Sequence, residues 1–357
     1  MMSLDIIKVL LPSLFSFLCG IIVSPYLADF LYKNKLWKKK SVEKTIDGRE
    51  ATISSMLHND EVKKTPRLGG IIIWFSVFAT ALSLWLLSKL FPSPMTEKFD
   101  FISRSQTWLP LFAMLVGAIV GAIDDLLVTD YFKKKGSYVG GGLSFPIRLF
   151  TVAFIGLFAG YWFYAKLGID HVFMPFYGDL NLGLLYIPFF VIVTVAIFST
   201  SVIDGIDGLS GGIFATIFSS VGIITFLHGQ VNIATLCFVI VGAILGFLWF
   251  NVPPALFYMS ETGILALTLA LSVISFMADI TIYLLIIALP LFVTSGSVIL
   301  QLLSKKYRGK KIFLVAPLHH HFEAKGWSRA TITMRYWIVS SMCALMGIVL
   351  VLLTYVK

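Results

Sequence analysis

The sequence predicts an all-α integral membrane protein with about ten transmembrane helices and both termini on the outer side. Of its 357 residues, 58% are hydrophobic and only 13% are charged, whereas a soluble domain usually carries about 25% charged residues. A water-soluble core cannot hide this much apolar surface, so a lipid bilayer must solvate much of it. Because the apolar runs follow one another across short gaps, we expect residues 1–357 to form a single transmembrane domain.

The apolar runs set the expected spans, since about 20 apolar residues in a helix cross a bilayer core of about 30 Å. The eighth run is short, and the ninth contains Pro290, which can break a helix within the membrane. The expected spans are roughly 6–30, 69–91, 108–128, 145–165, 184–200, 209–227, 231–250, 262–277, 280–303 and 334–355.

Lys and Arg residues set the expected orientation, because they concentrate in cytoplasmic loops. With the N-terminus outside, 22 of the 28 Lys and Arg residues fall in the inner segments, which are 31–68, 129–148, 201–208, 251–261 and 304–335. The net charge of +9 is compatible with nucleic acid, an anionic membrane surface or anionic substrates. The sequence has no recognisable nucleic-acid motif, so we expect no nucleic-acid partner.

Two adjacent acids, Asp124 and Asp125, end the third expected span at the inner surface. Neighbouring carboxylates repel each other, and desolvation raises their pKa. A divalent cation relieves both problems, and Mg²⁺ favours oxygen ligands together with substrate phosphates. The alternative is a solvated helix end with two acids at the cytosolic interface.

Two further acids, Asp204 and Asp207, lie in a glycine-rich inner loop that includes Gly205. In a helix, their spacing of three residues places both on one face, and the glycines allow close backbone approach. Such a loop could present amides and carboxylates to a nucleotide. The alternative is a tight turn in which the aspartates cap a helix.

Glu261 opens the eighth expected span, and Asn251 and Tyr258 precede it on the same inner loop. Glu261 could bind a metal, or it could simply suit the positive end of the helix dipole. Tyr258 could stack on a base, or it could be an interfacial aromatic anchor.

Three consecutive histidines, His319, His320 and His321, lie in the long basic loop before the last span. Successive helical residues rotate by about 100°, so all three cannot face one point on a helix. One or two could reach a phosphate or act as acid or base; the alternative is a histidine-rich loop without such a role. Lys64 and Arg148 are placed to meet phosphates, although positive-inside topology also explains basic residues here.

These segments together resemble a known family. KKTPRLGG at 63–70, the acid pair, DGIDGL at 204–209, FNVPPALFYM at 250–259 and PLHHHFEAKGW at 317–327 are similar to the bacterial phospho-N-acetylmuramoyl-pentapeptide transferases. This family belongs to the polyprenyl-phosphate N-acetylhexosamine-1-phosphate transferase superfamily. The resemblance runs from about residue 44 to 340, and the HHHFE run followed by KGW is highly specific for the muramoyl-pentapeptide branch.

The resemblance implies ten transmembrane helices in the bacterial inner membrane, a cytoplasmic cleft, Mg²⁺ and a possible homodimer. It implies transfer of phospho-MurNAc-pentapeptide from UDP to undecaprenyl phosphate, giving lipid I and UMP. By resemblance, Glu261 and Asp125 hold the metal, and the catalytic group is Asp124, Asp125, His319, His320 and His321. The substrate-binding group is Lys64, Arg148, Asp204, Gly205, Asp207, Asn251 and Tyr258.

The sequence departs from the family pattern at several positions, among them Arg67, Val128, Ser201 and Glu261, the last standing where the family has Asp. The reaction we expect is direct attack by the lipid phosphate on the β-phosphate, with Asp124 accepting its proton or positioning it. Two alternatives are kept. One is transfer of another sugar phosphate, such as GlcNAc-1-phosphate; the other is a transporter or non-catalytic relative that binds nucleotide or lipid.

Overall fold

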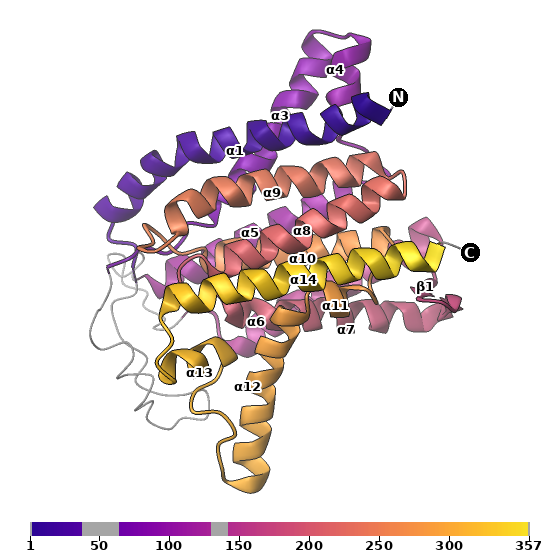
Figure 1. Ribbon diagram of the computed structural model, residues 1–357. Helices are drawn as coiled ribbons and strands as arrows, with labels where there is room; N and C mark the ends of the chain where they lie inside the picture. Colours follow the sequence, from indigo (N-terminus) through magenta and orange to yellow (C-terminus); the bar gives the residue numbers. More distant parts are fainter. Residues whose placement is uncertain (1, 38–63, 130–141, 356–357) are drawn as a thin grey trace.

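The computed structural model describes residues 2–37, 64–129 and 142–355, and in these ranges nine helices are long and apolar enough to cross a membrane. They form a bundle whose two chain termini lie at the same end (Figure 1). The helices are α1 (Met2–Lys33), α3 (Ile71–Leu90), α5 (Trp108–Val128), α6 (Phe145–Trp162), α7 (Tyr186–Phe198), α8 (Leu209–Leu227), α9 (Val231–Asn251), α10 (Ser260–Met277) and α14 (Arg329–Tyr355).

These nine helices confirm nine of the ten predicted spans, and the remaining span, 280–303, is broken near Pro290, as its sequence suggested. That segment is broken at Ala288 into α11 (Leu284–Ile287) and α12 (Leu289–Arg308). Pro290 lies in the first turn of α12, where its missing N–H is tolerated but a continuous helix through it is not. Figure 1 shows α12 leaving the bundle at a steep angle.

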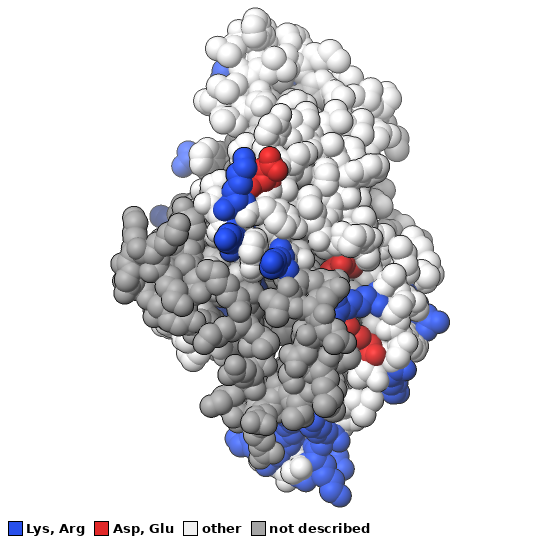
Figure 2. Space-filling view, turned by 90° about the vertical axis from the view of Figure 1, so that its left-hand side faces the viewer, with Lys and Arg blue, Asp and Glu red and all other residues white. Residues whose placement is uncertain are grey.

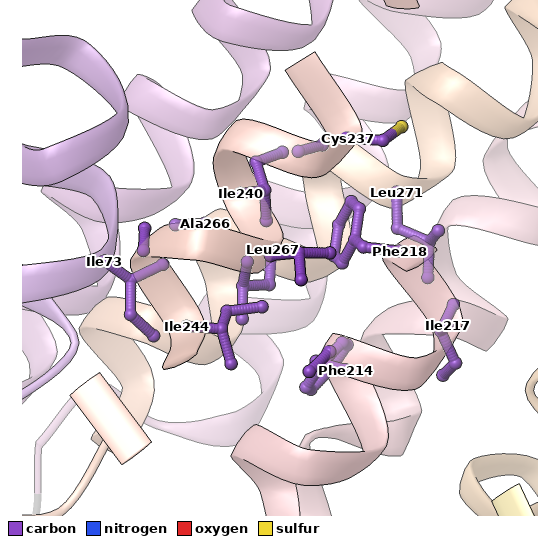
Figure 3. Close-up of a cluster of buried hydrophobic side chains, with 14 of the residues drawn as sticks. Ile73, Phe214, Ile217, Phe218, Cys237, Ile240, Ile244, Ala266, Leu267 and Leu271 are labelled. Atoms are coloured by element: carbon purple, nitrogen blue, oxygen red, sulfur yellow. The ribbon is translucent and has the colours of Figure 1, made fainter. Parts of the chain in front are cut away.

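The centre of the bundle consists of α8, α9 and α10. In their most apolar segments 72%, 78% and 89% of the residues are buried, compared with 22% in α1. Figure 3 shows Phe214 and Phe218 of α8 lying with Ile244 of α9 and Leu267 of α10 in one cluster. A helix that is apolar all round must be buried in protein or lipid; these three pack against protein, and the outer helices expose large apolar side chains suited to lipid.

The shorter elements lie between these helices. Three of them extend spans: the π-helix η2 (Phe163–Leu167) continues α6, and the 3₁₀ helices η3 (Gly183–Leu185) and η4 (Ser199–Ile203) flank α7. A small antiparallel hairpin, β1 (His171–Met174) with β2 (Gly178–Asn181), is the one feature that an all-α prediction missed within the described ranges. The remaining short helices are α4 (Pro94–Phe99) and α13 (Leu318–Ala324).

The inner segments predicted from Lys and Arg lie, where described, at the bundle end opposite the termini. The end of α5, the starts of α6, α8 and α10, and α13 all gather there (Figure 1). Seen from this end, the visible charged surface is mainly Lys and Arg, with a few Asp and Glu among them (Figure 2). The charge pattern along the chain therefore identifies one end of the folded molecule.

Candidate active site

The two helices that carry the acids, α5 and α10, are packed closely enough for their backbones to touch. A Cβ atom on Gly121 would lie 2.2 Å from the carbonyl oxygen of Glu261, and one on Gly117 would lie 2.5 Å from that of Leu265. Small residues four positions apart let transmembrane helices approach in this way. The approach brings Asp124 and Asp125 at the end of α5 against Glu261 at the start of α10.

Asp125 is fully buried, and both of its carboxylate oxygens have partners. Arg67 Nε donates to Oδ1 at 2.9 Å, and the backbone N–H of Thr262 donates to Oδ2 at 3.0 Å. A buried charge persists only when it is paired and hydrogen-bonded. Asp125 therefore joins the loop before α3 to α10, and the predicted phosphate- and metal-binding acid also has a structural task.

Asp124 and Glu261 share Arg148 from the start of α6. Arg148 Nη1 hydrogen-bonds to Glu261 Oε1 and lies 4.0 Å from Asp124 Oδ2, while the N–H of Leu143 donates to Asp124 Oδ1 at 2.6 Å. The second oxygen of Glu261, Oε2, is buried and has no hydrogen-bond partner within the described residues. A buried carboxylate oxygen without a hydrogen bond raises the free energy of the folded protein. A cation or a hydrogen-bond donor could therefore bind favourably at this oxygen.

The DGIDGL loop is held against the loop between α9 and α10. Asp204 accepts from Ser210 Oγ and from the N–H of Ser260, each at 2.8 Å. Burial raises the pKa of Asp204, although these two hydrogen bonds oppose the shift.

Asp207 and Asn251 make further hydrogen bonds between the DGIDGL loop and the segment around the end of α9. Asp207 Oδ2 accepts from the N–H of Ala255 at 3.1 Å, and Asn251 Oδ1 accepts from the N–H of Gly208 at 3.0 Å. Both side chains are nearly inaccessible. Asp207 therefore does not cap α8, which begins after Gly208 without a side-chain cap, but joins two loops. Its predicted contact with substrate stays a prediction, as does that of Asn251.

The histidines lie on α13 and split into two directions. His319 and His320 face Gly205, where a Cβ atom would lie 2.9 Å from His319 Nε2 and 3.0 Å from His320 Nε2. His321 points elsewhere: its Nδ1 accepts from the N–H of Leu314 at 3.1 Å. The structure thus brings two of the three histidines to the DGIDGL loop, in agreement with the helical rotation argument.

His319 is completely buried, and neither of its ring nitrogens has a hydrogen-bond partner within the described residues. Burial, and to a lesser extent the neighbouring His320, lowers the pKa of His319 well below its usual value. His319 is therefore a neutral imidazole beside the loop, with unsatisfied hydrogen-bonding capacity.

A cavity of about 270 Å³ lies where these segments meet. Its lining includes the predicted residues Asp204, Gly205, Tyr258 and Glu261, and also Arg67, Ser201, Ser260, Ile264 and Arg329. Its volume is near the lower end of small-molecule sites. Acids and arginines from α10, α14 and two loops therefore line one space, while Lys64 is exposed and outside that lining.

Comparison with known proteins identifies the family. A profile described as glycosyl transferase family 4 matches residues 107–279. A phospho-N-acetylmuramoyl-pentapeptide-transferase from Chloroflexus aggregans is 31% identical across 98% of this chain and 91% of its own length. Proteins of the same name from Pelagibacter ubique and a Geobacillus species are 33% and 31% identical, covering 80% and 93% of this chain and 80% and 94% of their own lengths. This chain belongs to the phospho-N-acetylmuramoyl-pentapeptide-transferase family.

The Mg²⁺ that this family implies can be tested against the residues present. No cluster of three or more His, Cys, Asp or Glu side chains in metal-binding arrangement occurs among the described residues. Mg²⁺, however, commonly uses only one or two carboxylates and takes its other ligands from water and substrate phosphates. Glu261 with its unpartnered Oε2, beside Asp124, fits this requirement. Asp125 fits it less well, because both of its oxygens are engaged by Arg67 and Thr262.

Three charged residues that line or support the cavity were not predicted as site residues from the sequence: Arg67, Glu323 and Arg329. Arg67 was visible as a departure from the family pattern, but nothing in the sequence paired it with Asp125. Glu323 lay inside the HHHFE motif and was interpreted only as part of it. Arg329 looked like one more positive-inside residue.

Proposed function

We propose that this protein transfers phospho-MurNAc-pentapeptide from UDP-MurNAc-pentapeptide to undecaprenyl phosphate at the cytoplasmic face of the bacterial inner membrane, giving lipid I and UMP. The main support is the family membership over 98% of the chain. The cavity adds to it, because carboxylates and arginines from distant segments line one space at the basic end of the bundle.

The reaction joins two anions, so their repulsion has to be reduced. Arg67 and Arg148 bring positive charge to the acid cluster through contacts with Asp125 and Glu261. In phosphoryl transfer, positioning and charge stabilisation supply most of the catalysis. Mg²⁺, held by Glu261 and Asp124, would screen the phosphate charges and polarise the phosphoryl oxygens.

An oxygen of the lipid phosphate forms the new bond to the β-phosphorus of the nucleotide. The bond that breaks joins this phosphorus to the oxygen bridging the two nucleotide phosphates, and UMP leaves with the electron pair. Asp124 accepts a proton from the lipid phosphate or positions it, and Asp125 keeps the loop before α3 in contact with α10.

A lipid acceptor is also supported by the surroundings of α13. His319 and His320 face the DGIDGL loop, whereas Leu318 and Phe322 of the same helix line an apolar cavity of about 400 Å³ between α12 and α14. An apolar space beside a polar one suits a substrate with a hydrocarbon chain and a charged head.

The test is turnover by the purified protein in detergent with undecaprenyl phosphate, UDP-MurNAc-pentapeptide and a Mg²⁺ titration. We expect UMP release that depends on both substrates and on Mg²⁺. UDP-GlcNAc in place of the muramoyl nucleotide should give no release; efficient release would instead favour transfer of GlcNAc-1-phosphate. Nucleotide binding without any UMP release would indicate a non-catalytic relative.

A further inference from the structure

Arg329, the first residue of α14, lines the cavity. Its Nε donates to Glu323 Oε1 at 2.7 Å. Of the five N–H donors of a guanidinium group, the other four make no hydrogen bond to any residue in the described ranges. Arg329 therefore has one edge fixed to the protein and donors left over for a ligand.

Glu323 joins Arg329 to His320. Its second oxygen, Oε2, shares a hydrogen bond of 2.8 Å with His320 Nδ1. Burial alone would raise the pKa of Glu323, but the hydrogen bonds with His320 and Arg329 outweigh it and lower this pKa to about 2. An ionised carboxylate only accepts, so His320 donates through Nδ1 and, when neutral, carries its lone pair on Nε2, which faces Gly205. One carboxylate thus orients two side chains of the site.

The charges around the cavity give Arg329 a specific task. Both arginines in the lining donate through Nε to a carboxylate, Arg67 to buried Asp125 and Arg329 to Glu323, but the side chain of Arg329 is more exposed, 32% against 24%. Asp204 and Glu261 add negative charge to the same lining. Tyr258 and Arg329 line this same cavity. An anion that enters the cavity therefore meets the remaining donors of Arg329.

We propose that Arg329 is a phosphate-binding residue for the nucleotide part of the substrate, and that Glu323 is the positioning residue that holds it. Guanidinium groups bind phosphate with two parallel hydrogen bonds, and Glu323 fixes the orientation that this geometry requires. The inference rests on the proposed function for its choice of ligand, a nucleoside monophosphate as product and the corresponding diphosphate as substrate.

The test compares the affinities of UMP and uridine for the full-length protein in detergent, measured by titration calorimetry at a fixed Mg²⁺ concentration. Arg329→Ala should weaken UMP binding by about tenfold or more, because charged hydrogen bonds are lost, while uridine binding stays within about twofold. Arg308→Ala is the matched control: it removes the same charge from the exposed end of α12, outside the cavity lining, and should change neither affinity.

Equal weakening of UMP and uridine, or no weakening of either, would overturn the assignment of Arg329 to the phosphate. Arg329→Lys keeps the charge without the planar fork and should retain only part of the UMP affinity. If Arg329→Ala does not fold, the UMP and uridine affinities of Arg329→Lys provide the test instead. Wild-type protein that binds no UMP, or releases none from UDP-MurNAc-pentapeptide, would instead contradict the proposed function.

The role of Glu323 is tested by a double-mutant cycle on UMP affinity. Glu323→Gln should weaken UMP binding by several-fold in the wild-type background and much less when Arg329 is already alanine, because the two residues act as a unit. Additive effects would contradict positioning through Arg329. Adding Arg329→Lys to Glu323→Gln should recover none of the UMP affinity that Glu323→Gln loses.

Discussion

Two groups of charged residues meet at the cavity, and they are built in opposite ways. In the first, three carboxylates of α5 and α10 are shared between two arginines, and one oxygen of Glu261 has no hydrogen-bond partner in the described part of the chain. In the second, the single carboxylate of Glu323 lies between His320 and Arg329, and both of its oxygens are used. Among the described residues, the first group keeps a spare carboxylate oxygen beside the unpartnered Nε of Arg148, whereas the carboxylate of the second group is fully used and Arg329 keeps spare donors.

This difference indicates which ligand each group suits. Spare carboxylate oxygens favour a hard cation, and spare guanidinium donors favour phosphate. A site for two phosphates and a divalent ion needs both. We therefore assign cation binding to the acid cluster and anion binding to the α13–α14 cluster, and the following changes test that division, from the largest expected effect to the smallest.

Glu261→Gln removes the negative charge of the carboxylate whose Oε2 has no hydrogen-bond partner among the described residues. We expect Mg²⁺-dependent UMP release to fall by about 10²-fold or more, as is typical when one charge-stabilising group of an active site is lost. Mg²⁺-induced thermal stabilisation should disappear as well. Unchanged UMP release across a Mg²⁺ titration would refute the role of Glu261.

Arg67→Ala leaves the buried carboxylate of Asp125 with only its backbone partner. We expect the free energy of unfolding to fall by on the order of 3 kcal/mol, since an uncompensated buried charge is expensive. Reversible denaturant unfolding in mixed micelles measures the free energy of unfolding of the variant and the wild type.

Two variants control the Arg67 experiment. Arg67→Ala combined with Asp125→Asn should recover part of the lost stability, because no buried charge then remains. Arg104→Ala, at an exposed position, should stay within about 0.5 kcal/mol of wild type. A loss from Arg67→Ala no larger than that from Arg104→Ala would mean that the Asp125 pair contributes little.

Gly205→Ala places a methyl group against the facing nitrogens of His319 and His320. The rings must move, so we expect UMP release to drop by about tenfold or more with smaller change in stability. Gly296→Ala is the control, because a Cβ there meets no atom within 4 Å. Equal activity of the two variants would show that the histidines do not act at this loop.

His319 predicts a pH dependence of stability. Its pKa in the folded protein lies well below the unfolded value of about 6.5. Below about pH 6.5 the unfolded chain therefore binds a proton that the folded protein excludes, and stability falls as the pH drops, by at most about 1.4 kcal/mol per pH unit. Unfolding free energies between pH 7.5 and about 5 measure this. His319→Asn should flatten the curve, and an unaltered slope would contradict a neutral buried imidazole.

Local patterns in the sequence predicted much of the architecture. The ends of α5 and α8 agree with the predicted spans 108–128 and 209–227 to the residue, since hydropathy acts on each segment by itself. Pro290 marked the weak point of the ninth run, but the departure of α12 from the bundle depends on its neighbours. The hairpin β1–β2 gave no signal strong enough to separate it from a loop.

By itself, the sequence determined that the chain is a membrane protein, where its helices run and which end carries the acids, because composition and charge bias require no knowledge of contacts. Only the tertiary structure decided which carboxylates keep a spare oxygen and which arginine faces the cavity. The pair Arg67–Asp125 and the closeness of Glu261 to Arg148 join residues 58 and 113 positions apart. The packing of α5 on α10 through Gly117 and Gly121 likewise brings Asp125 to the backbone N–H of Thr262, and it is a property of two surfaces and not of either segment alone.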